Sequence, residues 1–189
     1  MCTFFIAGCI PIDFRYFRLQ LLILKRAFQL LKPGGRMVYS TCSMNPVENE
    51  AVIAAALNSH SGNSMKLVDV SDRLPQLIRR PGLTSWSISD KAGALYDSMD
   101  AVPDNLKQNY KESMFPPTST DHDLHLERCI RVYPHLQDTG GFFVAVLEKD
   151  PLTADDIQDD AVGNIEVIGS REDPFILVEE QDAAVRNAR

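Results

Sequence analysis

The first strong hydrophobic pattern in the chain lies between Leu19 and Leu31. Its residues are strong helix formers, and the apolar positions cover well over half of the helical circumference. This pattern predicts a helix that is buried against a sheet. The run from Lys32 to Gly35 follows, in which a proline cannot continue the helix and a glycine is free to adopt a positive φ. We therefore expect the helix to end there.

A buried strand and a second helix are predicted directly after this turn. Residues 36–40 are mostly apolar and rich in strand-forming types, as in a strand covered on both faces. Asn45 is a good helix N-cap and Pro46 suits the first helical position. Glu48 lies three residues after the cap, where its side chain can reach back to the amide of the cap. The second helix should then run through Leu57.

The pattern is weaker over the remaining residues. Residues 66–70 and 128–133 each favour a short strand, and 142–147, which follows two glycines, is the best strand after the first. Between residues 71 and 126 no period is clear. Loops of this length are uncommon unless they are functional or disordered. This stretch should therefore cover a site or contain short helices.

Charge separates the body of the chain from its tail. Residues 1–150 contain 16 acidic and 16 basic side chains, whereas residues 151–189 contain 10 acidic and 3 basic ones and so carry the whole net charge of −7. A solvated acidic linker is expected from Pro151 onward, and the apolar cluster 174–178 is too small to form a core alone. The acidic balance does not argue against a nucleic-acid partner for the body.

The sequence gives no support for a membrane-spanning helix, a secretory leader or a disulfide framework. No apolar run approaches the roughly 20 residues that span a bilayer. The first ten residues could be misread as a short leader, but no basic residue precedes Arg15, which favours a remnant of truncation or splicing. The four cysteines are too few and too scattered for a disulfide framework, which favours a reducing compartment.

Cys42 is the residue whose position points to chemistry. It lies just past the carboxyl end of the first predicted strand, the edge at which open α/β sheets bind ligands. The positive end of the following helix would favour a thiolate over a thiol. The alternative is that Cys42 is a small residue packed at a strand-to-helix corner, where unpaired cysteines are often inert. Position alone therefore indicates a site but no reaction.

Several segments together carry a more specific signal. They are the run Gly34–Glu50 with Thr41-Cys42-Ser43 at its centre, Met114–Pro117, His125–His135, Thr139–Leu147 and Arg171–Phe175. In this order they resemble the RNA (cytosine-5)-methyltransferase family (NOL1/NOP2/Sun), and especially its eukaryotic tRNA-modifying branch. The resemblance covers roughly residues 19–178.

The resemblance implies a fold and a division into domains. The expected fold class is α/β, the later half of the Rossmann-like sheet of a class I S-adenosylmethionine-dependent methyltransferase, with an antiparallel end and an acidic tail. Residues 1–18 would be a non-matching leader segment. Residues 19–150 would be the carboxy-terminal part of the catalytic domain, and 151–189 an acidic linker with the start of an RNA-binding domain. The strand at Phe142 should lie between those at Arg36 and Lys66.

The resemblance also assigns roles to residues. In this family the cysteine of Thr-Cys-Ser attacks carbon-6 of a cytosine in RNA, and that role falls on Cys42. The attack makes carbon-5 enamine-like, so that it accepts a methyl group from S-adenosylmethionine. The resemblance implies tRNA as the partner and a location in the nucleus or nucleolus, with the cytoplasm as an alternative. Candidates for substrate contact are Thr41, Ser43, Arg128 and Arg131, although the two arginines could equally line a solvated strand face.

Two elements of the family's pattern are absent from the sequence. It has no Pro-Cys pair, the motif whose cysteine releases the product, and no glycine-rich cofactor loop, because Gly34 and Gly35 are interpreted as a helix stop. We expect a fragment that holds no cofactor-binding residues and is inactive alone. A catalytically silent RNA-binding or interaction remnant is the alternative. A class I methyltransferase acting on another substrate is a third hypothesis.

The spacing of His122, His125 and Cys129 could suggest a metal site. Three ligands without a fourth are a weak signal, and Arg128 and Arg131 lie among them. We therefore expect no metal. No membrane partner is expected either, and the sequence leaves the oligomeric state open.

Overall fold

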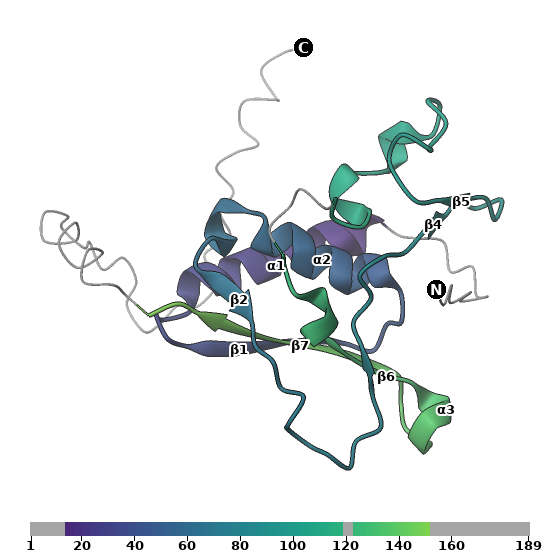
Figure 1. The fold of residues 1–189 in the computed structure, drawn as a ribbon. Coiled ribbons are helices and arrows are strands. Elements are labelled where there is room, and N and C mark those ends of the chain that lie inside the picture. The colour runs from purple at the N-terminus through teal and green to yellow at the C-terminus, as the bar shows by residue number, and fades with distance from the viewer. Residues whose placement is uncertain (1–13, 119–122, 152–189) are drawn as a thin grey trace, which may run out of the picture. The chain divides into compact units, whose positions relative to one another are not determined.

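The computed structural model describes residues 14–118 and 123–151, all within the compact unit Met1–Leu152 (Figure 1). The predicted leader, the acidic linker and the segment Arg171–Phe175 lie outside the described residues. The expected domain boundaries therefore stay predictions. None of the described helices has the length and apolar character needed to cross a membrane.

The first helix, α1 (Phe14–Leu30), begins five residues earlier than predicted. Its buried face carries Phe17, Leu24 and Phe28, which recur at helical spacing. The predicted stop is confirmed. Gly34 has a φ of 71°, and the ammonium of Lys149 donates to the carbonyls of Phe28 and Leu31 at 3.0 Å each, which satisfies carbonyls that the helix end leaves unpaired.

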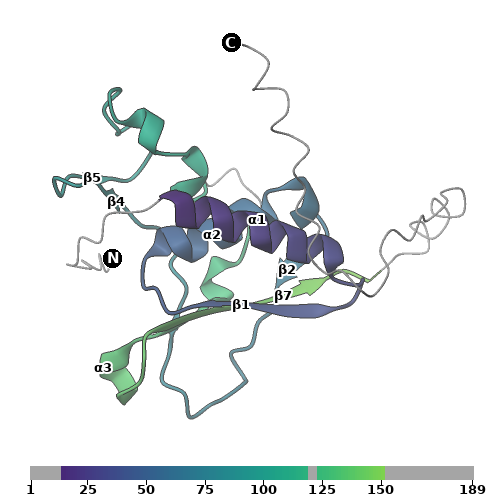
Figure 2. The ribbon, with the colours of Figure 1, turned by 180° about the vertical axis from the view of Figure 1, so that it is seen from behind.

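The opposite face of α1 is more exposed than its composition suggests. Among the described residues, Leu19, Leu22, Ile23 and Leu30 are each at least 54% exposed. The prediction of a helix buried against a sheet therefore holds for one face only. That face packs on the second helix, as Figure 2 shows from behind.

The second helix, α2 (Glu50–Leu57), is buried on all sides. It lies beside α1 on the same side of the sheet (Figure 1), and short 3-10 turns from other parts of the chain pack against its remaining sides. Its unbroken apolar sequence from Ala51 to Leu57 fits this position. The short 3-10 turn η2 (His60–Gly62) then leads into the next strand.

The sheet is centred on β7 (Phe142–Lys149), as predicted. β1 (Arg36–Thr41) pairs antiparallel along one side of β7, with Tyr39 opposite Ala145. The prediction that this strand is buried on both faces is wrong, because its residues alternate between exposed and half-buried. β2 (Met65–Leu67) and β6 (Ile130–Val132) pair antiparallel along its other side. The inward residues of β7 alternate with outward ones, and α1 and α2 cover the inward face (Figures 1 and 2). These inward residues are Phe143, Ala145 and Leu147.

The edge of β1 that faces away from β7 pairs with no other described strand. On the far side of the sheet, β3 (Arg80–Pro81) pairs with β6. The short helix α3 (Pro134–Gln137) connects β6 toward β7.

Residues 71–126, in which the sequence shows no clear period, contain short elements. This agrees with the expectation of short helices in this segment. It holds the hairpin β4 (Ile88–Ser89) and β5 (Leu95–Tyr96), followed by three 3-10 turns. The buried indole of Trp86 donates to the carbonyl of Met114 at 2.8 Å. This bond holds the two ends of the segment between these residues together. The three turns are η3 (Lys107–Asn109), η4 (Glu112–Met114) and η5 (Leu126–Arg128).

Candidate active site

Cys42 lies immediately after the last residue of β1, and its side chain is exposed. The predicted position at the carboxyl end of the strand is confirmed. The alternative was that Cys42 is an inert residue packed at a strand-to-helix corner. An exposed side chain does not fit that alternative. We call residues 42–45, which connect β1 to the next turn, the Cys42 loop.

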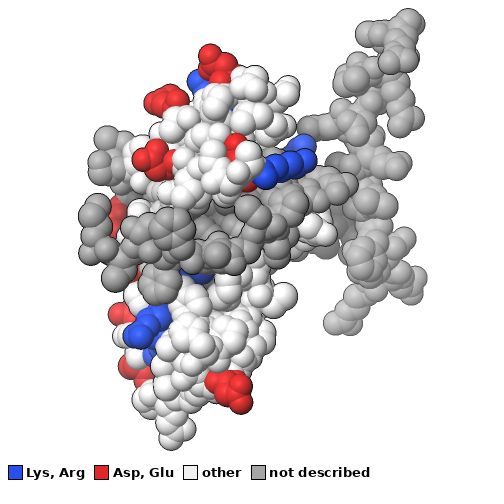
Figure 3. Space-filling view, turned by 90° about the vertical axis from the view of Figure 1, so that its right-hand side faces the viewer, with Lys and Arg blue, Asp and Glu red and all other residues white. Residues whose placement is uncertain are grey.

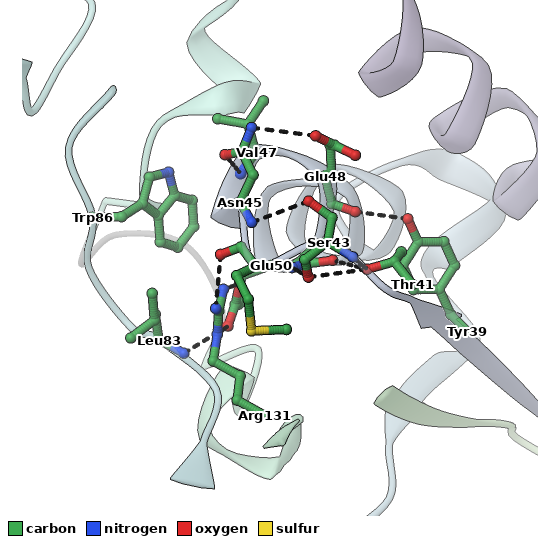
Figure 4. Close-up of polar contacts among 12 residues, drawn as sticks. Tyr39, Thr41, Ser43, Asn45, Val47, Glu48, Glu50, Leu83, Trp86 and Arg131 are labelled. Carbon is green, nitrogen blue, oxygen red and sulfur yellow. Dashed lines mark hydrogen bonds and ion pairs between the residues drawn. The ribbon is translucent and has the colours of Figure 1, made fainter. Parts of the chain in front are cut away.

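The two neighbours of Cys42 are tied to a single buried side chain, that of Asn49. The Thr41 hydroxyl donates to Oδ1 of Asn49 at 2.6 Å, and Nδ2 of Asn49 donates to the Ser43 carbonyl at 2.9 Å (Figure 4). The Ser43 amide in turn donates to the Thr41 hydroxyl oxygen at 3.2 Å. Asn49 has no exposed surface, so these bonds do not compete with water. The backbone on both sides of Cys42 is therefore held.

The predicted capping box is wrong in its details. Asn45 does act as a cap, because its Oδ1 accepts from the Val47 amide at 3.0 Å, but it caps the 3-10 turn η1 (Pro46–Glu48). The carboxylate of Glu48 accepts from the side-chain amide of Asn45 at 3.4 Å, while the Asn45 backbone amide donates to the Ser43 hydroxyl. The amides of Val47 and Glu48 are both used by Asn45, so they cannot assist a thiolate at Cys42.

The expected single helix is interrupted at Asn49. Its backbone, at φ −120° and ψ −98°, is not helical, and α2 begins only at Glu50. The side chain of Asn49 is committed to the Cys42 loop, and this local bonding competes with helix continuation. Tyr39 fixes the same junction, since its hydroxyl donates to the Glu48 carbonyl at 2.8 Å. Burial, with the charge of Glu48, raises the pKa of Tyr39, so the phenol stays a donor at neutral pH.

Arg131 does not face solvent, which contradicts its expected role as a phosphate contact. Its side chain has no exposed surface and forms an ion pair with the equally buried Glu50, with Nε to Oε1 at 2.6 Å and Nη2 to Oε2 at 2.5 Å. Burial alone would lower the pKa of Arg131, but the hydrogen bond and charge of Glu50 raise it. A guanidinium held this way has no surface to offer an RNA backbone.

Arg128 is half-buried, and its Nη1 donates to the Leu67 carbonyl at 3.0 Å. A role in RNA contact stays a prediction for this residue. Figure 3 shows one face of the molecule, on which small basic and acidic groups are separated by uncharged surface. The described residues on this face therefore form no broad basic surface of the kind that binds phosphate backbones.

Of the three residues that were considered as metal ligands, the structure describes His125 and Cys129. Cys129 is buried, and burial raises the pKa of its thiol, so it is not the thiolate that binds metals. His125 instead lies near Asp123 and Glu127 at the surface, with one ligand atom of each within 4.8 Å of the others. His122 lies outside the described residues. Among the described residues, the group around His125 does not include Cys129.

The two described cysteines should differ sharply toward an alkylating reagent. In the native chain at pH 8, iodoacetamide should modify Cys42 readily, whereas Cys129 should react only after urea unfolding, because its thiol is buried and its pKa is raised. Peptide mass spectrometry after a timed reaction measures both sites. Equal labelling of both cysteines in the native chain would contradict the described burial.

Sequence reasoning missed Asn49 and Glu50 as residues of the site. A signal was available, since a wholly apolar helix such as Ala51–Leu57 is buried all round, and polar residues at its start must then find partners. The sequence did not show which residues are the partners of Asn49 and Glu50. Arg131 lies 81 residues from Glu50 along the chain, and only the pairing of β6 with β7 brings them together.

Comparison with known proteins places this site in a family. The family model for 16S rRNA methyltransferase RsmB/F matches residues 12–148. The Schizosaccharomyces pombe multisite-specific tRNA:(cytosine-C(5))-methyltransferase is 54% identical over 138 residues, 72% of this chain and 20% of that protein. The Drosophila melanogaster tRNA (cytosine(34)-C(5))-methyltransferase is 44% identical over 133 residues, 69% of this chain and 18% of that protein.

Two further comparisons complete this result. The Saccharomyces cerevisiae multisite-specific tRNA:(cytosine-C(5))-methyltransferase is 44% identical over 137 residues, 69% of this chain and 18% of that protein. A crystal structure of a methyltransferase homolog protein from Pyrococcus horikoshii matches with 27% identity and a TM-score of 0.46, over 71% of this chain and 31% of that one.

This chain spans about a fifth of the length of the curated relatives that it matches. Within that span, the helices and the antiparallel sheet around β7 are those of the later half of a Rossmann-like methyltransferase fold. Since the family model covers residues 12–148, well over half of the sequence, the chain belongs to the RsmB/F methyltransferase family.

Proposed function

We propose that this chain supplies the nucleophile of an RNA (cytosine-5)-methyltransferase, with tRNA as the substrate and Cys42 as the attacking residue. The observation that carries the proposal is the exposed Cys42 side chain at the carboxyl end of β1, between two neighbours whose backbone is held by Asn49. A fixed backbone with an accessible thiol is what a nucleophile at the mouth of a sheet requires. The tRNA relatives support the choice of substrate.

The proposed step uses the sulfur electrons of Cys42. The thiolate forms a bond to carbon-6 of cytosine, and the electrons of the 5,6 double bond move toward carbon-5, which becomes nucleophilic. After carbon-5 has gained a methyl group, its proton leaves to a base and the carbon–sulfur bond breaks, which returns the thiolate and restores the ring. The residues of this chain account for the first and last bonds to sulfur.

The methyl donor of this chemistry is S-adenosylmethionine, and the two glycines at the end of α1 do not fit a cofactor loop for it. The glycines at the end of α1 are used inside the fold, since the Gly34 amide donates to the Lys149 carbonyl at 3.0 Å and the Gly35 amide to the Lys32 carbonyl at 2.9 Å. Amides that cradle a cofactor must point at it. The donor would therefore be held by residues other than Gly34 and Gly35, in line with the interpretation of these glycines as a helix stop.

A chimera with the S. pombe relative tests the proposal. Residues 12–148 of this chain would replace the matching segment of that protein, and the purified chimera would be given S-adenosylmethionine and a tRNA transcript. We expect 5-methylcytosine in the tRNA, measured by nucleoside mass spectrometry. RNA containing 5-azacytosine should form a covalent complex, whose peptide map places the adduct on Cys42.

The outcomes separate the competing hypotheses. A chimera that melts like the parent enzyme but gives neither 5-methylcytosine nor an adduct indicates a catalytically silent remnant. A chimera that methylates RNA with the adduct at another residue excludes Cys42 as the nucleophile. A nuclear location stays a prediction, which a fluorescent fusion in cells would test.

A further inference from the structure

Glu50 and Arg131 form a buried ion pair directly behind the Cys42 loop. Neither side chain has exposed surface, and the two groups meet in the parallel, two-bond geometry that guanidinium and carboxylate favour (Figure 4). The ring of Phe143 lies 5.8 Å from the guanidinium carbon and shields one side of it. The proposed chemistry at Cys42 does not explain this pair.

Stability alone is a weak reason for such a pair. The desolvation of two charges is costly, and replacing a buried ion pair with apolar side chains is often neutral or stabilising. A fold that only needed to fill this space could use apolar residues, as it does at every position from Ala51 to Leu57. The geometry of the pair therefore calls for a further role.

The remaining hydrogen bonds of the pair show what it holds. The third guanidinium nitrogen of Arg131, Nη1, donates to the Met44 carbonyl at 3.0 Å, two residues after Cys42. Oε1 of Glu50 also accepts from the Leu83 amide at 2.8 Å, which fixes the chain between β3 and β4. The pair thus joins four segments at one point: α2, β6, the Cys42 loop and the segment at Leu83.

Resting on the proposed function, we infer that Glu50 and Arg131 are positioning residues for the nucleophile. Arg131 holds the Met44 carbonyl, and Glu50 orients the guanidinium that does so. Asn49 holds the other side of the loop through Thr41 and Ser43. Together these contacts fix the backbone before and after Cys42 and set the direction in which its thiol meets carbon-6 of cytosine.

Two variants test the role in different ways. Glu50→Met with Arg131→Met replaces the pair with apolar side chains of similar length and removes the bond to Met44. Arg131→Lys keeps the charge but offers one ammonium, which cannot reproduce the planar guanidinium contacts to Glu50 and Met44 together. The control is Arg36→Met with Glu148→Met, which removes an arginine–glutamate ion pair at the surface, at the far end of β1, where Arg36 is 60% exposed.

The variants would be measured in the chimera and in this chain. In the chimera we expect kcat for tRNA methylation to fall by about 10²-fold, as for a small misplacement of a reacting group, with KM for tRNA little changed. In this chain the amides of Ser43 and Asn45 should exchange with deuterium about tenfold faster, as for the loss of a hydrogen bond, while β7 amides stay protected. The control pair should change neither quantity.

Several results would overturn the inference. One is a folded variant that keeps its kcat, and another is an equal loss of kcat in the control pair. If the double variant does not fold, Arg131→Lys decides, and unfolding of both variants would show that the pair serves stability alone. If the unsubstituted chimera is inactive, the proposed function fails, and the exchange of the Ser43 and Asn45 amides then decides the positioning role by itself.

Discussion

Replacing Cys42 with alanine should lower the rate of cytosine-5 methylation by the chimera by about 10³-fold or more, the scale seen when a nucleophile is removed. Without the sulfur, carbon-5 of cytosine is not activated, and no other described thiol is exposed to replace it, because Cys129 is buried. The tRNA should still bind, since the substitution removes a small side chain from the surface. The measurement is 5-methylcytosine formed per minute at saturating tRNA.

Controls distinguish lost chemistry from lost structure. Cys42→Ser keeps the size of the side chain but offers a far weaker nucleophile, so it should be nearly as inactive and form no 5-azacytosine adduct. Ser40→Ala changes an exposed residue on β1 two positions earlier and should leave the rate unchanged. Normal methylation by Cys42→Ala would favour a methyltransferase that does not use this residue.

Replacing Phe143 with alanine should destabilise the chain by about 3–5 kcal/mol, the usual cost of removing a buried aromatic ring. Phe143 has no exposed surface and lies near the start of the central strand β7, where it is paired with Thr41 of β1 on one side and Arg131 of β6 on the other. Its ring meets that of Tyr39 edge to face at a centroid distance of 6.3 Å, and it also faces the guanidinium of Arg131. Urea unfolding followed by circular dichroism measures the change.

The neighbouring residue provides the matched control. Phe142 lies on the same strand with 47% of its surface exposed, so Phe142→Ala should cost well under half as much as the buried substitution. Similar unfolding midpoints for the two variants would show that the sheet does not bury the face assigned to Phe143.

The arrangement around Cys42 combines an accessible thiol with an inaccessible frame. Asn49, Glu50 and Arg131 have no exposed surface, yet their polar atoms hold the backbone beside an exposed residue. Buried polar networks that are fully bonded specify one geometry. The need to hold the backbone beside Cys42 from the interior explains why two charged residues are buried in a small α/β unit.

The order of the main elements and the place of Cys42 after the first strand were determined by the sequence itself. Local signals were sufficient for this: the helix-forming run that ends at Gly34, the strand before Cys42 and the cap at Asn45 all depend on residues within a few positions of one another. The central position of the strand at Phe142 came from the family resemblance and is confirmed. The interruption at Asn49 was missed, because the side chain that competes with the helix bonds to residues before it in the loop.

Only the tertiary structure decided whether Glu50 and Arg131 are buried and which partner each one has. The sequence presented Arg131 as a charge on a short strand and Glu50 as the start of a helix, and nothing near either residue indicated that they meet. Their pairing arises because β6 lies beside β7 while α2 packs on the same sheet, which removes both side chains from water at one point. Local patterns report propensity and periodicity, whereas the partner of a buried charge depends on which distant segments the fold brings together.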